Sequence, residues 1–157
     1  MSNLTHNTQG TTTDELQQIL NTQVANWSLL GVKLHHHHWF VKGPQFYVLH
    51  EKFEELYNAA AGYVDELAER MLAIGAKPAA TMSQYLKLAT LQEASNEKSA
   101  EQMVGQLVAD FEQLAVELKA GIDAANQEGD DATADLLTGM VSDVQKHTWM
   151  LNAYLGK

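Results

Sequence analysis

Apolar side chains recur every three or four residues over most of the chain, a spacing that predicts amphipathic helices. The pattern breaks at Gly43-Pro44 and around Pro78, where glycine and proline end one helix and precede the next. No useful stretch alternates between apolar and polar residues, so no strand is expected. The breaks predict four long helices and, in the connection between the second and third, one short helix: about 14–41, 45–74, 99–127, 131–155 and 81–89.

This organisation predicts an all-α fold, a four-helix bundle with a short extra helix in its long middle connection. Asp14 and Gln17 have the spacing of a capping box, which places the start of the first helix at Asp14. Residues 1–13 are polar and have little to bury, so they are expected to form a disordered tail before a single bundle domain at 14–157. Apolar stripes of the first and third long helices are expected in the core: Leu16, Leu20, Val24, Trp27, Leu34 and Val41, then Met103, Leu107, Phe111, Leu114, Leu118 and Ile122.

Composition narrows the class of protein further. The 157 residues suit one domain, and the absence of cysteine excludes disulfides and cysteine-bound zinc. With 20 acidic residues against 10 Lys plus Arg, the net charge is −10, and Arg70 is the one arginine. That balance disfavours a grip on phosphate backbones and favours cations. No apolar run reaches membrane-spanning length and no signal peptide is recognisable, so a cytoplasmic protein without a membrane partner is expected.

The second long helix has two distinct faces. A second stripe, formed by His50, Glu54, Asp65 and Glu69, lies very roughly 130° around the helix from its apolar seam. These four residues are therefore expected on a flank and not in the core of their own bundle. The seam itself has heptad-like spacing and consists of Phe46, Leu49, Phe53, Leu56, Ala60, Val64, Leu67, Met71 and Ile74.

The spacing along this flank predicts two half-sites for metal. His50 with Glu54, and Asp65 with Glu69, are i, i+4 pairs that can each present two ligand atoms to one ion. The pairs are separated by about three turns, or ~16 Å, which one ion cannot bridge. An antiparallel second copy of the helix across a two-fold axis would join each pair to its complement and create two sites per dimer.

His38 is the candidate for a further nitrogen ligand, because only a short connection separates its helix from that of His50. Two histidines with carboxylates suit iron, manganese or zinc, and the absence of thiolates favours iron. Simpler interpretations remain open: such acidic pairs are usually solvated, and His50 could be a surface histidine. In the run His35 to His38, adjacent residues lie about 100° apart, so they cannot all serve one ion. An accessory site involving His35 or His36 is a further possibility.

Several segments resemble the Dps family of mini-ferritins. They are His38-Trp39-Phe40-Val41-Lys42-Gly43, Leu49-His50-Glu51-Lys52, Asp65-Glu66-Leu67-Ala68-Glu69-Arg70, Glu128-Gly129-Asp130-Asp131-Ala132-Thr133 and His147-Thr148-Trp149-Met150. The resemblance runs from about residue 23 to 156 and implies a ferritin-like bundle, two-fold dimers and a hollow shell of twelve subunits. It also implies oxidation of Fe(II), usually by hydrogen peroxide, at inter-subunit ferroxidase centres. Storage of the ferric mineral inside the shell would protect against oxidative damage.

By this resemblance His38, His50 and Glu54 come from one chain, and Asp65 and Glu69 from its two-fold mate. Zinc or manganese could replace iron there. Glu54 stands where the family more often has Asp, which puts the second iron of a di-iron centre in question. Trp39 resembles the family's aromatic neighbour of the centre, which absorbs stray oxidising equivalents, although a packing role is equally compatible with the sequence.

Two further pairs of acidic residues each have a functional and a purely structural interpretation. Asp131 and Asp135 match acidic positions of the family's three-fold iron-uptake pores, and Asn126 departs from the acid found in some relatives. The alternative is that acids at a helix N-terminus stabilise its dipole. Glu51 and Glu55 lie beyond the ligand stripe and are either solvated or, in a shell, sites of mineral nucleation.

Two other functions compete with that of an iron-oxidising cage. Some relatives coat DNA through lysine-rich tails, but residues 1–13 contain no Lys or Arg and the chain ends at Lys157 directly after the last helix. Direct DNA binding is therefore disfavoured. The alternatives are a cage that acts mainly in DNA protection and a cage with reduced ferroxidase activity because of Glu54.

Overall fold

The computed structural model describes residues 13–157, and its helices agree with the predicted all-α architecture. Each bound lies within a residue or two of the expectation, and no strand occurs among the residues described. The predicted tail at 1–13 lies, apart from Thr13, outside that range. The helices are α1 (Asp14–Phe40), α2 (Phe46–Ala73), α3 (Met82–Leu88), α4 (Ala100–Gln127) and α5 (Asp131–Tyr154).

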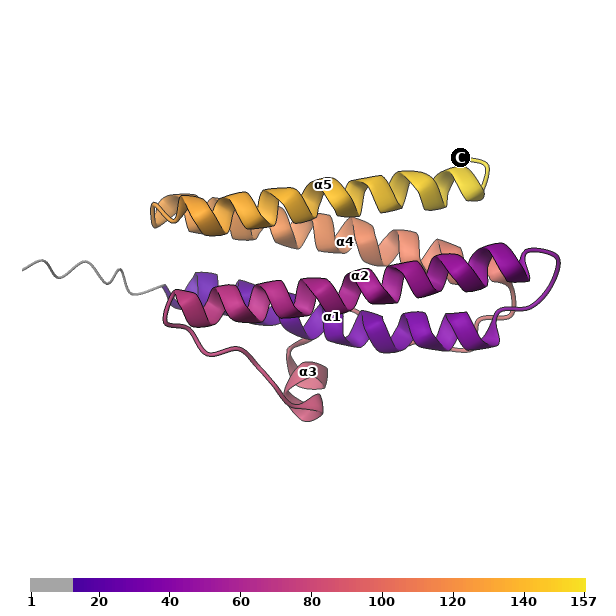
Figure 1. Ribbon diagram of the computed structural model, residues 1–157, viewed down its shortest axis with the longest axis horizontal. Helices are drawn as coiled ribbons and strands as arrows, with labels where there is room; N and C mark the ends of the chain where they lie inside the picture. Colours follow the sequence, from indigo (N-terminus) through magenta and orange to yellow (C-terminus); the bar gives the residue numbers. More distant parts are fainter. Residues whose placement is uncertain (1–12) are drawn as a thin grey trace, which may run out of the picture.

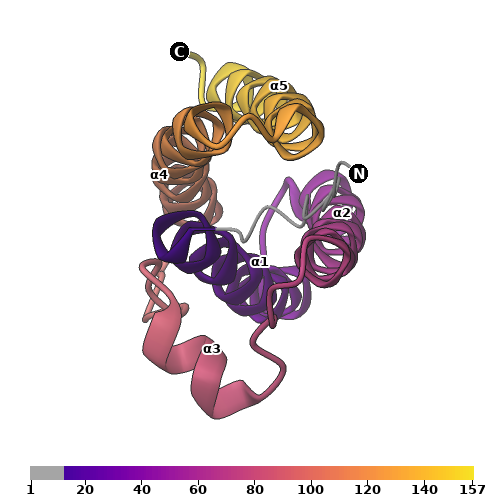
Figure 2. The same cartoon turned by 90° about the vertical axis from the view of Figure 1, so that its left-hand side faces the viewer.

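The four long helices form a bundle, in which α1 pairs with α2, α4 pairs with α5, and α1 joins the two pairs through α4 (Figures 1 and 2). Helices α2 and α4 run in the same direction, so the connection between them must return along the length of the bundle (Figure 1). That connection carries α3, which packs outside the bundle against α1 (Figure 2). None of the helices in the described part has the length and apolarity to cross a membrane.

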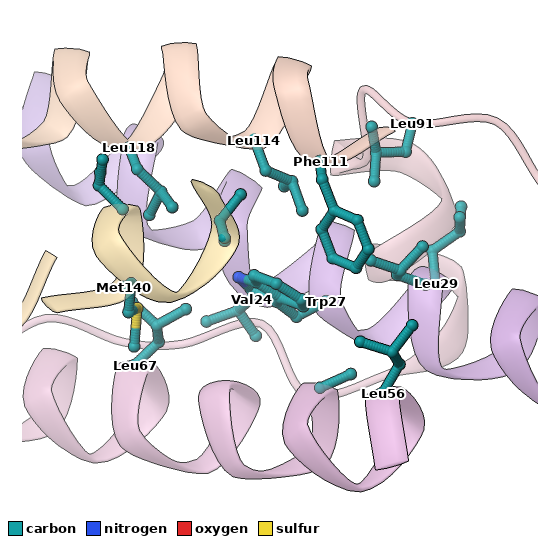
Figure 3. Packing of buried hydrophobic residues seen from close by; sticks show 14 of the residues in the cluster. Val24, Trp27, Leu29, Leu56, Leu67, Leu91, Phe111, Leu114, Leu118 and Met140 are labelled. Carbon is teal, nitrogen blue, oxygen red and sulfur yellow. The ribbon is translucent and has the colours of Figure 1, made fainter. Parts of the chain in front are cut away.

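Trp27 occupies the middle of the core, between side chains from all sides of the bundle (Figure 3). Its ring lies 4.5 Å from that of Tyr63 and 6.1 Å from that of Phe111, centroid to centroid. The apolar stripes expected in α1 and α4 are buried, except that Ile122 is only partly so. In the α2 seam Phe46, Val64 and Ile74 are partly buried and the other members are fully buried. The periodicity of the sequence therefore identified the core correctly.

The start of α1 differs from the expectation. Thr13, not Asp14, is the N-cap: its backbone is extended and its hydroxyl accepts from the Leu16 N–H at 3.4 Å. Asp14 is the first helical residue, where its charge favours the helix dipole. The Thr13 N–H donates to the Glu128 carboxylate, which ties this end of α1 to the turn between α4 and α5. With Thr13 as the cap, both Asp14 and Glu15 lie in the first turn of α1.

Arg70 joins α2 to the beginning of α5. Its guanidinium donates to the Asp130 carboxylate and to the Thr133 hydroxyl, both at 2.9 Å. Asp130 is also the N-cap of α5 and accepts from the Thr133 N–H at 3.0 Å. Gly129, just before it, has φ +72°, a left-handed conformation that glycine adopts without strain. The one arginine of the chain thus has a structural role at the turn between α4 and α5.

Candidate metal centre

His38 at the end of α1 and His50 in the first turns of α2 lie face to face. Their imidazole rings stack with centroids 3.6 Å apart and planes 15° apart. Each ring binds the backbone of the other residue: His38 Nδ1 contacts the His50 carbonyl oxygen at 2.6 Å, and His50 Nδ1 contacts the His38 carbonyl oxygen at 2.8 Å. The turn between α1 and α2 is thereby closed by a reciprocal pair of histidines, and the structure brings together the two imidazoles that the sequence suggested could meet.

These contacts determine which ring nitrogen is available. A carbonyl oxygen can only accept, so each Nδ1 carries the proton and donates it. In a neutral imidazole the Nε2 lone pair is then free to bind a metal, and the Nδ1–carbonyl bond fixes the orientation of the ring. His38 is 8% exposed and His50 is partly buried. The pair therefore presents two oriented nitrogen donors near the surface.

Glu54 lies one turn after His50 on α2 and is exposed. Its Oε1 accepts from the Tyr57 hydroxyl at 3.1 Å. The Tyr57 ring meets His38 edge-on at 5.3 Å and stacks on His35 at 3.8 Å, centroid to centroid. Desolvation, followed by the bond to the Glu54 carboxylate, raises the pKa of Tyr57, so the phenol stays protonated and donates. Tyr57 thus connects the carboxylate with the histidine pair, a contact that the sequence did not suggest.

Asp65 and Glu69 lie further along α2, and both are exposed. Because α2 is one continuous helix from Phe46 to Ala73, the interval between Glu54 and Asp65 is about 16 Å along its axis. The structure therefore does not bring the two predicted pairs together within one chain. They lie on an open flank, where a second molecule has access to both.

The remaining predicted residues are all at the surface. Trp39 is 65% exposed, so it is not part of the core, and its ring lies 5.4 Å from that of His35. Asp131 and Asp135 are exposed on the first turns of α5, where Asp131 is in the first turn beside the cap. Glu51 and Glu55 are exposed on α2, and Glu55 forms an ion pair with Lys52 at 3.2 Å.

The structure also contains a second group of potential metal ligands, of which the sequence had suggested only His36. Of the described residues, His36, His37 and Glu97 form the one set of three or more such side chains whose donor atoms lie within 4.8 Å of one another. His36 and His37 are on α1, and Glu97 is in the connection before α4. Only the histidine run hinted at this group, since Glu97 is far away in the sequence and has no neighbouring ligand.

Burial controls the charge of His37. Desolvation lowers the pKa of His37 to about 4, an effect that the nearby Glu97 carboxylate opposes and that His36 and Lys33 reinforce. The ring is therefore neutral near pH 7 and its nitrogen lone pair is available.

The fold and the surface donors define the class of protein as a ferritin-like bundle. Residues 17–157 match the family model described as ferritin-like domain. The chain is 52% identical over 140 residues to DNA protection during starvation protein 2 of Bacillus anthracis, covering 89% of this chain and 96% of the relative. It is 52% identical over 143 residues to general stress protein 20U of Bacillus subtilis, covering 91% of this chain and 99% of that protein.

Solved structures agree with these sequence relationships. The crystal structure of Dps from Staphylococcus aureus superposes with a TM-score of 0.89 at 47% identity, covering 92% of this chain and 97% of that one. The chain belongs to the Dps family of mini-ferritins. Membership of this iron-binding family supports a role in iron storage or DNA protection.

Proposed function

We propose that this protein oxidises Fe(II) at a centre shared by two subunits and stores the ferric product. The observation that carries the proposal is the reciprocal His38–His50 pair, which leaves two oriented Nε2 donors one helical turn from Glu54. Asp65 and Glu69 of a two-fold mate complete the set with oxygen donors. Mixed imidazole and carboxylate ligands suit iron, and zinc or manganese would compete for the same donors.

The reaction balances with hydrogen peroxide as oxidant. Each Fe(II) gives up one electron and the peroxide takes two, so two Fe(II) are oxidised as the O–O bond breaks. Two protons convert the peroxide oxygens to water, and hydrolysis of the ferric ions afterwards releases protons. The chain's carboxylates bind the substrate cation, and the two histidines hold it in place through rings oriented by their Nδ1 bonds. Trp39 beside this region is exposed and could donate an electron to stray oxidants.

The centre requires an oligomer, and the surface has features suited to one. Trp39 and Trp149 are 65% and 66% exposed, and such large exposed aromatics are typical of subunit interfaces. The proposed assembly is a shell of twelve subunits built from two-fold dimers. In that assembly Asp131 and Asp135 would line uptake pores for Fe(II), and Glu51 and Glu55 would face the mineral.

The shared centre can be tested by complementation between two inactive variants. His50→Gln removes one imidazole half-site, and Glu69→Gln removes a carboxylate from the other half. Each variant alone is expected to oxidise Fe(II) at least about 10-fold more slowly with peroxide. In coexpressed subunits, half of random dimers are mixed and each mixed dimer has one intact site, so about a quarter of the wild-type rate returns.

Glu66→Gln is the matched control, because Glu66 is also exposed on α2 and its replacement changes the charge equally. Its rate is expected to equal that of the wild type. Absence of recovery in the coexpressed sample, with mixed dimers shown by mass spectrometry, would contradict a centre built from two subunits.

A further inference from the structure

The cluster of His36, His37 and Glu97 lies apart from the shared centre and is complete within one chain. Its three donor groups lie within 4.8 Å of one another and come from α1 and from the connection that precedes α4. Side chains 60 residues apart in sequence therefore meet through the tertiary fold, and no second subunit is needed to gather them.

Two donor atoms of the cluster are buried without a partner. His37 is fully buried, and its Nε2 has no hydrogen-bond partner among the described residues. The Oε2 atom of Glu97 is likewise buried and has no hydrogen-bond partner among these residues. Buried polar atoms are normally satisfied, so a nitrogen and an oxygen left open within one cluster indicate a missing ligand. A cation that binds both would satisfy them together.

Glu97 is held in position for this role. Its Oε1 accepts from the Ser95 N–H at 2.8 Å and from the Ser95 hydroxyl at 3.3 Å, which leaves Oε2 for another partner. Partial burial on its own would raise the pKa of Glu97, but the backbone N–H groups of Ser95 and Glu97 and the nearby His37 hold it below its ordinary value. The carboxylate is therefore ionised.

The neighbouring charges do not oppose a cation. The ammonium group of Lys33 acts on His37, and it is already paired. Its Nζ forms an ion pair with Asp110 at 2.8 Å and donates to the Gln92 carbonyl oxygen at 2.9 Å. With Lys33 and Asp110 neutralising one another, the ionised Glu97 leaves a net negative charge beside two imidazoles.

Two members of the cluster border hollows in the surface. His36 lines a cavity of about 260 Å³ between α1 and α3, together with Ser28, Lys33 and Glu93. Glu97 lines a separate, more open depression of about 440 Å³ on the side of α4. One ligand of the cluster therefore borders each of these two hollows.

We propose that His36, His37 and Glu97 bind a divalent transition-metal ion of the Fe²⁺, Co²⁺ or Zn²⁺ type, at a site distinct from the shared centre. Two imidazoles and one carboxylate form a donor set that such ions favour and that leaves a coordination position for water. His36 Nδ1 and His37 Nδ1 lie 3.3 Å apart, within hydrogen-bond distance of each other. Ligand distances near 2.0–2.2 Å require the donors to close by about 1 Å. The bound ion would fasten the connection before α4 to α1.

Zinc alone is a suitable probe for this site. Crystals soaked with Zn²⁺ and measured at the zinc absorption edge are expected to show an anomalous peak between His36, His37 and Glu97. In solution, equilibrium dialysis should show one Zn²⁺ fewer per chain for Glu97→Gln and for His36→Gln than for the wild type. Each of these variants leaves the fully buried His37 in place.

Glu93→Gln is the matched control, since Glu93 is exposed in the same connection and loses the same charge. It should retain the wild-type number of ions, with affinity changed at most about 2-fold. Equal loss of zinc in Glu93→Gln and Glu97→Gln would show that the ion is held by general electrostatic attraction and would overturn the assignment of Glu97 as a ligand. Zinc peaks confined to the His38–His50 region would also overturn the proposal, whereas failure of the shared centre alone would leave this site bound.

Discussion

Two groups of side chains in this molecule use histidines from the run His35 to His38, but they differ in how their members come together. His38 turns toward α2 and forms a stacked pair with His50, in which each Nδ1 is bound to the other residue's carbonyl oxygen. His36 and His37 turn toward the connection before α4 and meet Glu97 within the same chain. His36 and His38 point about 200° apart around the helix, so members of one run reach different surfaces. In the proposed centre the first group depends on a second subunit, whereas the second group is gathered within one chain.

The largest effect should come from separating the subunits. Protein kept monomeric by dilution, as checked by sedimentation, should oxidise Fe(II) with peroxide no faster than the protein-free reaction. The half-sites around Glu54 and Asp65 are too far apart along α2 for one chain to close a centre. The same monomers should still bind Zn²⁺ between His36, His37 and Glu97, because all three belong to one chain. A monomer with full oxidation activity would break the comparison.

The next effect concerns stability and compares a carboxylate with structural partners, Asp130, with an exposed one, Asp65. Asp130→Asn weakens the ion pair with Arg70 and the α5 cap, so unfolding should require about 1–2 kcal/mol less in urea titrations. Asp65→Asn, at an exposed position, should change the unfolding free energy by less than about 0.5 kcal/mol. A large loss of unfolding free energy in Asp65→Asn would show that this carboxylate stabilises the fold, which would argue against a role as a metal ligand.

Asp130 also predicts a pH dependence. Partial burial alone would raise the pKa of Asp130, but the Thr133 hydroxyl and N–H and the Arg70 guanidinium outweigh it and lower the pKa. The unfolded chain therefore binds this proton more readily than the folded one. The contribution is complete above the unfolded value of about 4 and is lost as the pH falls through the lower folded pKa. Urea unfolding of wild type and Asp130→Asn should converge in that acidic range.

A smaller effect is expected at Tyr57. Tyr57→Phe removes the hydroxyl that donates to Glu54 but keeps the ring against His35 and His38. One hydrogen bond of this kind is worth roughly 1 kcal/mol, so Fe(II) oxidation should slow about 5-fold. Zinc binding at the Glu97 cluster should stay at the wild-type level. Tyr47→Phe, on an exposed tyrosine of the same helix, is the control, and an equal slowing there would refute a role for the Tyr57 hydroxyl.

The smallest effect should follow from Ser95→Ala. The Ser95 hydroxyl is one of two donors to Glu97 Oε1, and the backbone N–H remains after the substitution. Zinc affinity at this cluster should therefore fall only about 2- to 3-fold by calorimetry. Ser142→Ala, on the exposed side of α5, should leave the affinity unchanged. A loss of the bound ion in Ser95→Ala would show that the hydroxyl itself is a ligand.

The fold was largely predictable because its signals are local and periodic. Apolar spacing places Leu20, Trp27 and Phe111 in the core, and Gly43-Pro44 marks the turn between α1 and α2. The exact start of α1 was less certain, since Thr13 and Asp14 are both good caps and only the backbone conformation of Thr13 distinguishes them. The stripe on α2 could be found because Glu54, Asp65 and Glu69 share one helix.

By itself, the sequence determined the helices, the apolar faces and the separation of the two half-sites along α2, because each follows from fixed helical geometry. Tertiary structure decided the rest. It brought Glu97 to His37 across 60 residues, oriented His38 and His50 through each other's carbonyl groups, and placed Arg70 on Asp130. These contacts depend on how the connection before α4 crosses the bundle and how tightly the α1–α2 turn closes, and no local periodicity encodes either.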